Sequence, residues 1–282
     1  MTDLSAIWDL VILVVVAFVP AIIYLSWVRG TERYGSQEGW GTLLRAFFYG
    51  AIFATIVAAI LEGVIVYLGT AVSVTYPAPE FVFLNSNSSL GVLFLVLVVA
   101  PFIEEAMKAS GVVAFQRSFR QLADGPVVGA GVGLGFGFFE TFLYGLGAFL
   151  VGGLAAGIVL ILIRSVSSVL LHGSSTGMFG YGFARSKYHQ PGPGTGAYYL
   201  VAVGMHASFN LLASLSVVLV LLGITSIASG AADLIALFAA IFFAFWAIEH
   251  VRSIIQASSY PGLLGTTVRS QPAVRPATPK QR

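Results

Sequence analysis

The chain has 282 residues, of which only 14 are basic and 12 acidic; charged residues make up 9%, against about 25% in an ordinary soluble domain. Hydrophobic residues make up 57%, and the mean hydropathy is +0.91, which is more apolar surface than a soluble protein of this length can bury. The sequence therefore predicts an all-α, polytopic membrane protein. It excludes a soluble enzyme and nucleic-acid binding, and the absence of cysteine excludes disulfides and thiolate metal sites.

Seven apolar stretches are long enough to cross a bilayer as helices. In chain order they cover residues 5–28, 43–69, 90–115, 127–150, 154–184, 198–223 and 231–255. The first is too long for the core of a signal peptide and has no basic residue before it, so it is predicted to remain as a span. The fifth is long enough to tilt or break in the membrane. Residues 1–257 are thus expected to form one transmembrane domain.

The basic residues predict the orientation of this domain. Twelve of the 14 flank the inner ends of the predicted spans, in the first, third and fifth loops and after the last span, and none lies in the other loops. The positive-inside rule therefore predicts an outer N-terminus and a cytoplasmic C-terminus. Residues 258–282 are rich in Pro, Ser and Thr and predict a disordered basic tail, lying at most against the anionic inner leaflet.

Several ionisable residues fall inside the predicted spans, where a charge costs about 2.5–3.5 kcal/mol on insertion scales. Glu104, Glu140, His172 and His206 lie on four different spans, each roughly 12–20 Å from the inner surface at about 1.5 Å per residue. This agreement in depth predicts a shared site. Glu62 differs, because it lies near the outer end of its stretch.

Local spacing supports the shared site. Lys108 follows Glu104 by four residues and Glu105 by three, so it can neutralise one of these carboxylates along the helix. His206 and Asn210 are also four residues apart, on one helix face.

A second pair of patterns lies between these motifs. Phe136 and Glu140 share a helix face, and the glycines before them are predicted to let a neighbouring helix approach closely. Arg164 and His172 belong to a polar stripe with period four, in which hydrogen-bonded packing explains the serines better than it explains a mid-membrane Arg and His.

Motifs of several known protease and hydrolase classes are absent or out of context. No His-Glu-x-x-His sequence occurs, which excludes the site-2 type of metalloprotease. Gly173-Ser-Ser-Thr-Gly177 fits the serine-hydrolase pattern, but that pattern requires a strand–turn–helix elbow, and here it lies in a predicted helix. No pair of mid-membrane Asp residues is present for an aspartyl dyad.

Four motifs follow one another on successive predicted helices, over about residues 90–215: Glu104-Glu105-Ala-Met-Lys108, Phe136-Gly-Phe-Phe-Glu140, His172, and His206-Ala-Ser-Phe-Asn210. In this order they resemble the PrsW family of membrane proteases, which is related to the CAAX prenyl endoproteases and the Abi (CPBP) proteins. The lysine that closes the first motif favours PrsW over the prenyl-protease branch.

The resemblance implies an intramembrane endopeptidase of the cell membrane that cuts a membrane protein, such as an anti-sigma factor, within or near the bilayer. Its partners would be this substrate and the lipid. The implied catalytic residues are Glu104, Glu105, Glu140, His172, His206 and Asn210, supported by Lys108, Phe136 and Arg164.

The residue chemistry permits such a reaction. Either Glu104 or Glu105 is suited to be the general base; we favour Glu104, although helix geometry alone does not separate the two. Glu140, His172 and His206 suit zinc with an open fourth position, but they could also bind water without metal, with His206 and Asn210 stabilising the oxyanion.

Two alternatives remain at this point: a proton- or metal-coupled transporter, and a non-catalytic membrane protein of the Abi type. The short chain and the lack of an evident internal repeat disfavour transport. An enzyme requires its polar residues to converge on one cavity, whereas a transporter would string them along a path between the two faces.

Overall fold

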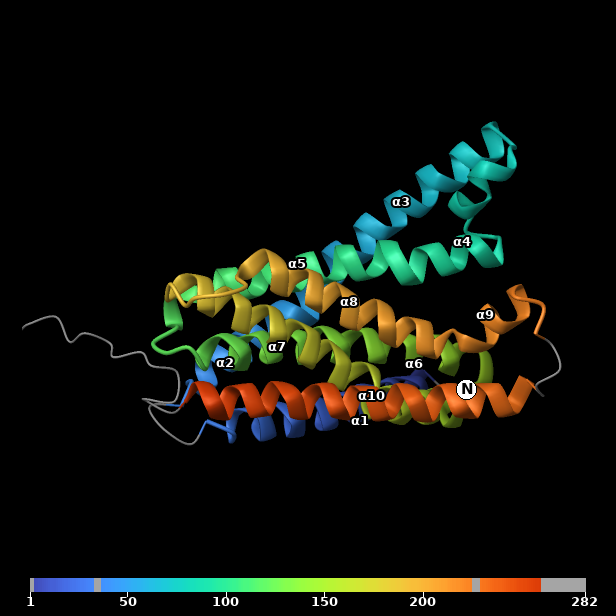
Figure 1. Cartoon of the computed structure of the whole chain (residues 1–282). Helices are drawn as coiled ribbons and strands as arrows, with labels where there is room; N and C mark the ends of the chain where they lie inside the picture. Colours follow the sequence, from blue (N-terminus) through green and yellow to red (C-terminus); the bar gives the residue numbers. More distant parts are fainter. Residues whose placement is uncertain (1–2, 33–36, 225–228, 260–282) are drawn as a thin grey trace, which may run out of the picture.

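A computed structural model describes residues 3–32, 37–224 and 229–259, and every regular element in these ranges is a helix, which confirms the all-α prediction (Figure 1). The predicted tail lies almost entirely outside the described residues. The elements in chain order are α1 (Asp3–Arg29), α2 (Trp40–Phe48), η1 (Tyr49–Ala54), α3 (Thr55–Thr75), η2 (Pro79–Leu84), α4 (Ser89–Phe94), η3 (Leu95–Val99), α5 (Ala100–Ala114), η4 (Gln116–Ser118), α6 (Asp124–Ser165), α7 (Ser168–Lys187), α8 (Thr195–Ala213), α9 (Leu215–Leu221) and α10 (Ser229–Ser258).

In the described part of the chain, five helical stretches are long and apolar enough to cross a membrane, or six if α8 and α9, bent by 70°, count as one. The prediction was seven. The difference arises partly because two expected spans fall within one stretch, Asp124–Lys187. In that stretch the chain reverses at Gly153, whose φ of 77° favours glycine, so that Gly157 returns to lie against Gly145.

Glycines bring α6 and α7 into backbone contact at the centre of the molecule. A Cβ at Gly129 would collide with the carbonyl oxygen of Thr176, and a Cβ at Gly133 with that of His172. Gly137, one further turn along, would meet the His172 ring at 3.2 Å. The predicted close approach is therefore confirmed, and it holds His172 against the helix that carries Glu140.

The opposite face of α6 packs on the N-terminal helices in the same manner. Gly135 lies directly against the backbone of Phe47 at the end of α2, and Gly50 in η1 lies against Val132. The Phe47 ring stacks on Phe138 with centroids 5.7 Å apart. Helix α6 is thus clamped between α2 with η1 on one side and α7 on the other.

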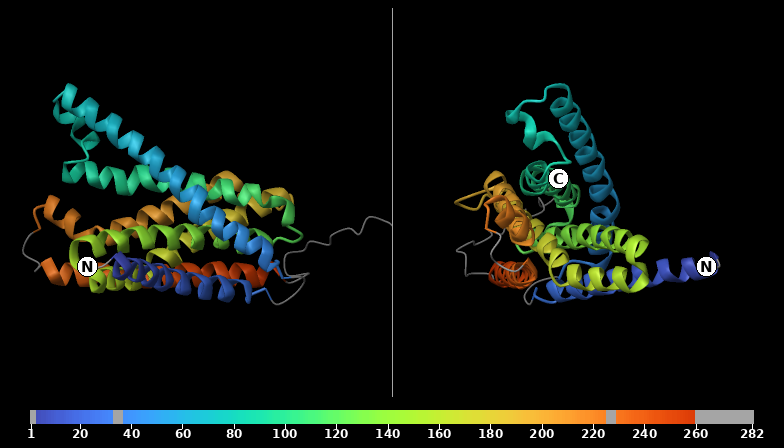
Figure 2. Two further views of the ribbon diagram at one scale, coloured as in Figure 1. Left: turned by 180° about the vertical axis from the view of Figure 1, so that it is seen from behind. Right: turned by 90° about the vertical axis from the view of Figure 1, so that its right-hand side faces the viewer.

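Helix α3 leans away from the other helices toward its C-terminal end, as both views of Figure 2 show. It continues to Thr75, six residues beyond the predicted end at Gly69. Its outer half is exposed, with Tyr67 74% and Val74 68% accessible. Such apolar exposure is expected of a helix that faces lipid.

Candidate active site

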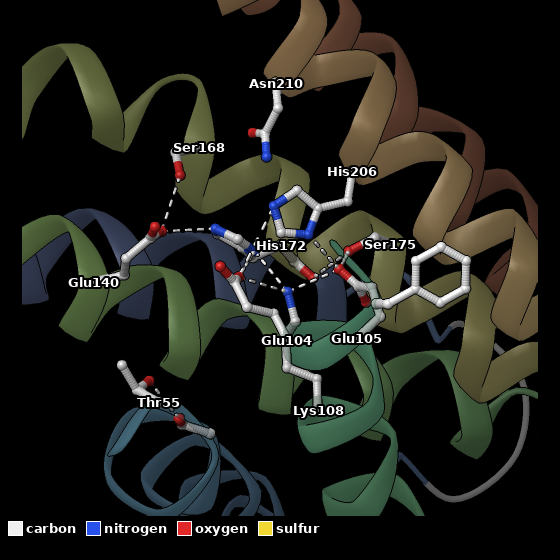
Figure 3. Close-up of polar contacts among 12 residues, drawn as sticks. Thr55, Glu104, Glu105, Lys108, Glu140, Ser168, His172, Ser175, His206 and Asn210 are labelled. Atoms are coloured by element: carbon white, nitrogen blue, oxygen red, sulfur yellow. Dashed lines mark hydrogen bonds and ion pairs between the residues drawn. The ribbon is translucent and has the colours of Figure 1, made fainter. Parts of the chain in front are cut away.

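The predicted site residues come together at the centre of the helix bundle (Figure 3). Helix α5 supplies Glu104, Glu105 and Lys108; α6 supplies Phe136, Glu140 and Arg164; α7 supplies His172; and α8 supplies His206 and Asn210. The polar side chains that were predicted to share a site on four spans therefore do lie together.

Lys108 is the central cation of this cluster and is completely buried. Its Nζ lies 2.8 Å from Glu105 Oε1 and 3.6 Å from Glu104 Oε2. It also donates a hydrogen bond of 2.8 Å to His172 Nδ1 and stands 4.4 Å from the centre of the Phe136 ring. A lysine is found at such depth only with partners of this kind, so Lys108 joins α5 to α6 and α7.

The two adjacent glutamates have different surroundings. Glu105 Oε1 accepts hydrogen bonds from Ser175 Oγ and His206 Nδ1, both at 3.0 Å, in addition to its ion pair with Lys108. Glu104 Oε2 is buried and accepts no hydrogen bond from the described residues. Glu105 is consequently held in place by its partners, whereas Glu104 is available to act on a bound molecule. The helix periodicity alone did not distinguish these two roles.

His206 is oriented by Glu105. Because a carboxylate only accepts hydrogen bonds, the Nδ1 of His206 carries the proton in this contact. The lone pair of Nε2 is then free, and this atom lies 3.9 Å from Glu104 Oε2. A carboxylate that binds the far nitrogen of a histidine in this way is a usual support for a metal ligand.

His172 is held from both sides. Its Nδ1 accepts from the Lys108 ammonium, which has only donors, so its Nε2 donates to Glu140 Oε2 at 2.8 Å. Its ring lies perpendicular to that of His206, with centroids 5.0 Å apart. The two imidazoles therefore stand side by side next to Glu104.

Glu140 is paired rather than free. Its Oε2 accepts from Arg164 Nη2 at 2.8 Å and from Ser168 Oγ at 3.4 Å, in addition to His172. Arg164 lies under the ring of Tyr144, with its Cζ 3.9 Å from the centroid. Arg164 is therefore the counter-charge of Glu140.

The cluster opens into a cavity of about 380 Å³. Glu104, Glu140, His172 and His206 line it, and so does Asn210, whose Nδ2 donates a hydrogen bond of 2.7 Å to the carbonyl of Val96 in η3. This hydrogen bond ties α8 to η3, which directly precedes α5.

Three residues of this region were missed by the sequence analysis. Ser175 was treated only as part of a false hydrolase motif, yet it binds Glu105. Tyr144 packs on Arg164, and no spacing pattern pointed to it. Glu62 was expected near the outer surface, apart from the site, but it lines the cavity. The expectation differed because α3 extends further than the sequence predicted.

Glu104, His172 and His206 form a group that fits a metal ion, with one ligand atom from each lying within 4.8 Å of the others. The oxygen and nitrogen donors are those that zinc takes, and Glu104 Oε2 is an unsatisfied buried atom. The predicted set shared both histidines but contained Glu140, which here is committed to Arg164 and His172. His172 would have to release Lys108 or Glu140 to offer a nitrogen.

These features define a helical membrane protein with a buried Glu/His site of the hydrolytic kind. Residues 38–248 match the family described as PrsW family intramembrane metalloprotease, and the chain belongs to this family. It is an intramembrane metalloprotease by family and a multi-pass membrane protein. No curated protein and no solved structure matches the chain.

Proposed function

We propose that this chain is an endopeptidase of the cell membrane that cleaves a membrane-protein substrate within or near the bilayer. The observation that carries the proposal is the convergence of Glu104, His172 and His206 beside one cavity of about 380 Å³. A cavity of this size accommodates a short extended peptide segment and water, as peptide hydrolysis requires.

Glu104 is the proposed general base. Its side chain lines the cavity, and within the described part of the chain no hydrogen bond engages Oε2. Glu105, in contrast, is occupied by Lys108, Ser175 and His206. A carboxylate within reach of the attacking water can take its proton and then return it to the leaving amine.

Glu104, His172 and His206 would hold the metal of the family, for which zinc is the proposed ion; Glu104 would offer one carboxylate oxygen to it and keep the other as the base. When bound, the ion supplies Lewis-acid polarisation of the scissile carbonyl. The protein residues orient the ligands: Glu105 holds the ring of His206, and Glu140 holds that of His172. Val96 O accepts one Nδ2 hydrogen of Asn210, and the second hydrogen of this amide would be the donor to the developing oxyanion.

We propose seven spans with an outer N-terminus and a cytoplasmic tail, on the basis of the basic-residue distribution. A regulatory membrane protein with one span, such as an anti-sigma factor, is the proposed physiological substrate class, on the basis of the family alone.

The test is proteolysis by purified protein in liposomes that contain a single-span substrate with a quenched fluorophore pair across its membrane segment. Wild-type protein is expected to cleave it, and E104Q and H206A to lose at least about 100-fold in rate. H250A is the matched control, because His250 is exposed on α10, stacks on Trp246 and does not line the cavity. Zinc or proton uptake by the same liposomes, without any cleavage, would favour the transporter alternative instead.

A further inference from the structure

The cavity contains one carboxylate that the proposed mechanism does not use. Glu62 on α3 lines it together with Glu104 and His172. Its Oε1 is buried and has no hydrogen-bond partner in the described part of the chain. A buried acceptor without a partner is unfavourable unless something else supplies a donor.

The side chain reaches the cavity because of the face of α3 on which it lies. Thr55, Ala58, Ala59 and Glu62 all line the cavity and follow the spacing i, i+3, i+4 and i+7 that defines one side of a helix. Three of these four side chains are short. The longer Glu62 is therefore the one group through which α3 can offer a charge to a bound molecule.

The charges around the cavity do not balance within the protein. Lys108 is committed to Glu105, at 2.8 Å, and Arg164 to Glu140, also at 2.8 Å. Glu104 has its own role with the histidines. No ion pair joins Glu62 to a basic residue among the described residues, so a carboxylate within a candidate membrane span is left without an ion-pair partner.

We infer that Glu62 is a specificity-determining residue that receives a Lys or Arg side chain of the substrate close to the scissile bond. The inference rests on the proposed peptidase function. A basic substrate side chain supplies both missing elements, a hydrogen-bond donor for Oε1 and a positive charge. The substrate is accordingly a membrane segment with a basic residue on the side that faces α3.

The test measures binding, so that it does not depend on turnover. The probes are single-span peptides that differ only in having Lys, Gln or Glu at one position, which is moved residue by residue through the membrane segment and its flanks. They are added to the E104Q protein in liposomes. At the best position, the Lys peptide is expected to bind about tenfold more tightly than the Gln peptide.

Removal of the Glu62 charge should remove this preference. In E104Q/E62Q the ratio of Lys to Gln affinity is expected to fall to about one, while E104Q/E62D, which keeps a carboxylate, retains a preference for Lys. E104Q/E80Q is the matched control, because Glu80 is exposed in η2 and does not line the cavity; it should keep the full ratio. If E62Q fails to fold, E62D against E62A gives the same comparison.

The inference is overturned if no position shows a Lys preference, or if the preference is the same with and without the Glu62 carboxylate. Cleavage of the same peptides by wild-type protein is measured separately, so that failure of this inference can be distinguished from failure of the proposed peptidase function. Cleavage without a preference that depends on Glu62 removes the inference alone. A Glu62-dependent preference without cleavage supports the binding role and removes the peptidase function.

Discussion

Lys108 Nζ donates to His172 Nδ1 across 2.8 Å at the centre of the bundle. This contact sets an ammonium group against an imidazole, and it determines which nitrogen of His172 carries the proton. Because the same ammonium pairs with Glu105, this one side chain connects α5, which carries the two glutamates, to α7, which carries the proposed metal ligand His172.

Loss of this ammonium should destabilise the protein as well as inactivate it. K108M leaves Glu105 without its cation in a buried setting, and we expect a loss of about 3–5 kcal/mol in the free energy of unfolding. The measurement is unfolding of the detergent-solubilised protein. R45M, which removes an exposed cation on α2, should change stability by less than about 1 kcal/mol. An equally small effect of K108M would contradict the central role of this lysine.

Substitutions of the two adjacent glutamates should affect activity and stability to different extents. E105Q loses an ion pair with Lys108 and alters the hydrogen bond that orients His206, so it should lower stability by about 1–3 kcal/mol and reduce cleavage. E104Q alters an atom that makes no hydrogen bond and should abolish cleavage with a stability within about 1 kcal/mol of wild type. Cleavage rates and unfolding curves measured on the same preparations check both parts. The reverse pattern would assign the base to Glu105.

The contact between α6 and α7 should tolerate no side chain at Gly133. A Cβ there collides with the His172 carbonyl, so G133A is expected to cost at least about 1–3 kcal/mol and to displace His172. G147A is the matched control in the same helix, because nothing lies within 4 Å of a Cβ at that position. It should be neutral or slightly stabilising. Wild-type stability of G133A would show that the helices can separate without cost.

Stability should depend on pH through a carboxyl outside the spans. Burial raises the pKa of Glu32 to about 7, and the nearby Asp124 and Glu38 carboxylates also raise it. Because the folded state holds this proton more tightly than the unfolded chain, with its pKa of 4.5, the contribution of Glu32 to stability is full below about pH 4.5 and is lost as the pH rises to about 7. The thermal midpoint at pH 5 and pH 8 measures this.

E32Q should reduce the difference between these two midpoints, and E80Q should leave it as in wild type. An unchanged difference in E32Q would mean that Glu32 does not titrate in this range.

The proposed orientation can be tested with single cysteines, since the chain has none of its own. Asn87 and Arg117 are both exposed and fall on opposite sides in the proposed topology. A membrane-impermeant maleimide added to intact cells should label N87C and leave R117C unlabelled until the cells are opened. Labelling of R117C in intact cells would invert the topology.

The sequence predicted which residues form the site better than it predicted the role of each residue in it. The depths of Glu104, Glu140, His172 and His206 follow from span positions, because helix rise is nearly constant; their convergence was therefore predictable. The different roles of Glu104 and Glu105 were not, because they depend on partners from α7 and α8 that lie about 70 and 100 residues away.

Two further differences have physical causes. Glu140 was expected among the metal ligands, but the guanidinium of Arg164, 24 residues along the chain and beyond a reversal at Gly153, engages its carboxylate instead. Glu62 was placed near the outer surface because the predicted helix ended at Gly69. The actual helix ends at Thr75, which moves Glu62 toward the middle of its helix.

Zinc dependence of cleavage tests the central claim most directly, namely that Glu104, His172 and His206 hold a metal that makes this chain a peptidase. The rate of cleavage of the single-span substrate is measured on protein stripped of metal by a chelator and again after zinc is added back. Wild-type activity should fall by at least about 100-fold on stripping and return with zinc, while E104Q stays inactive in both states. Full activity of the metal-free wild-type protein would contradict the claim.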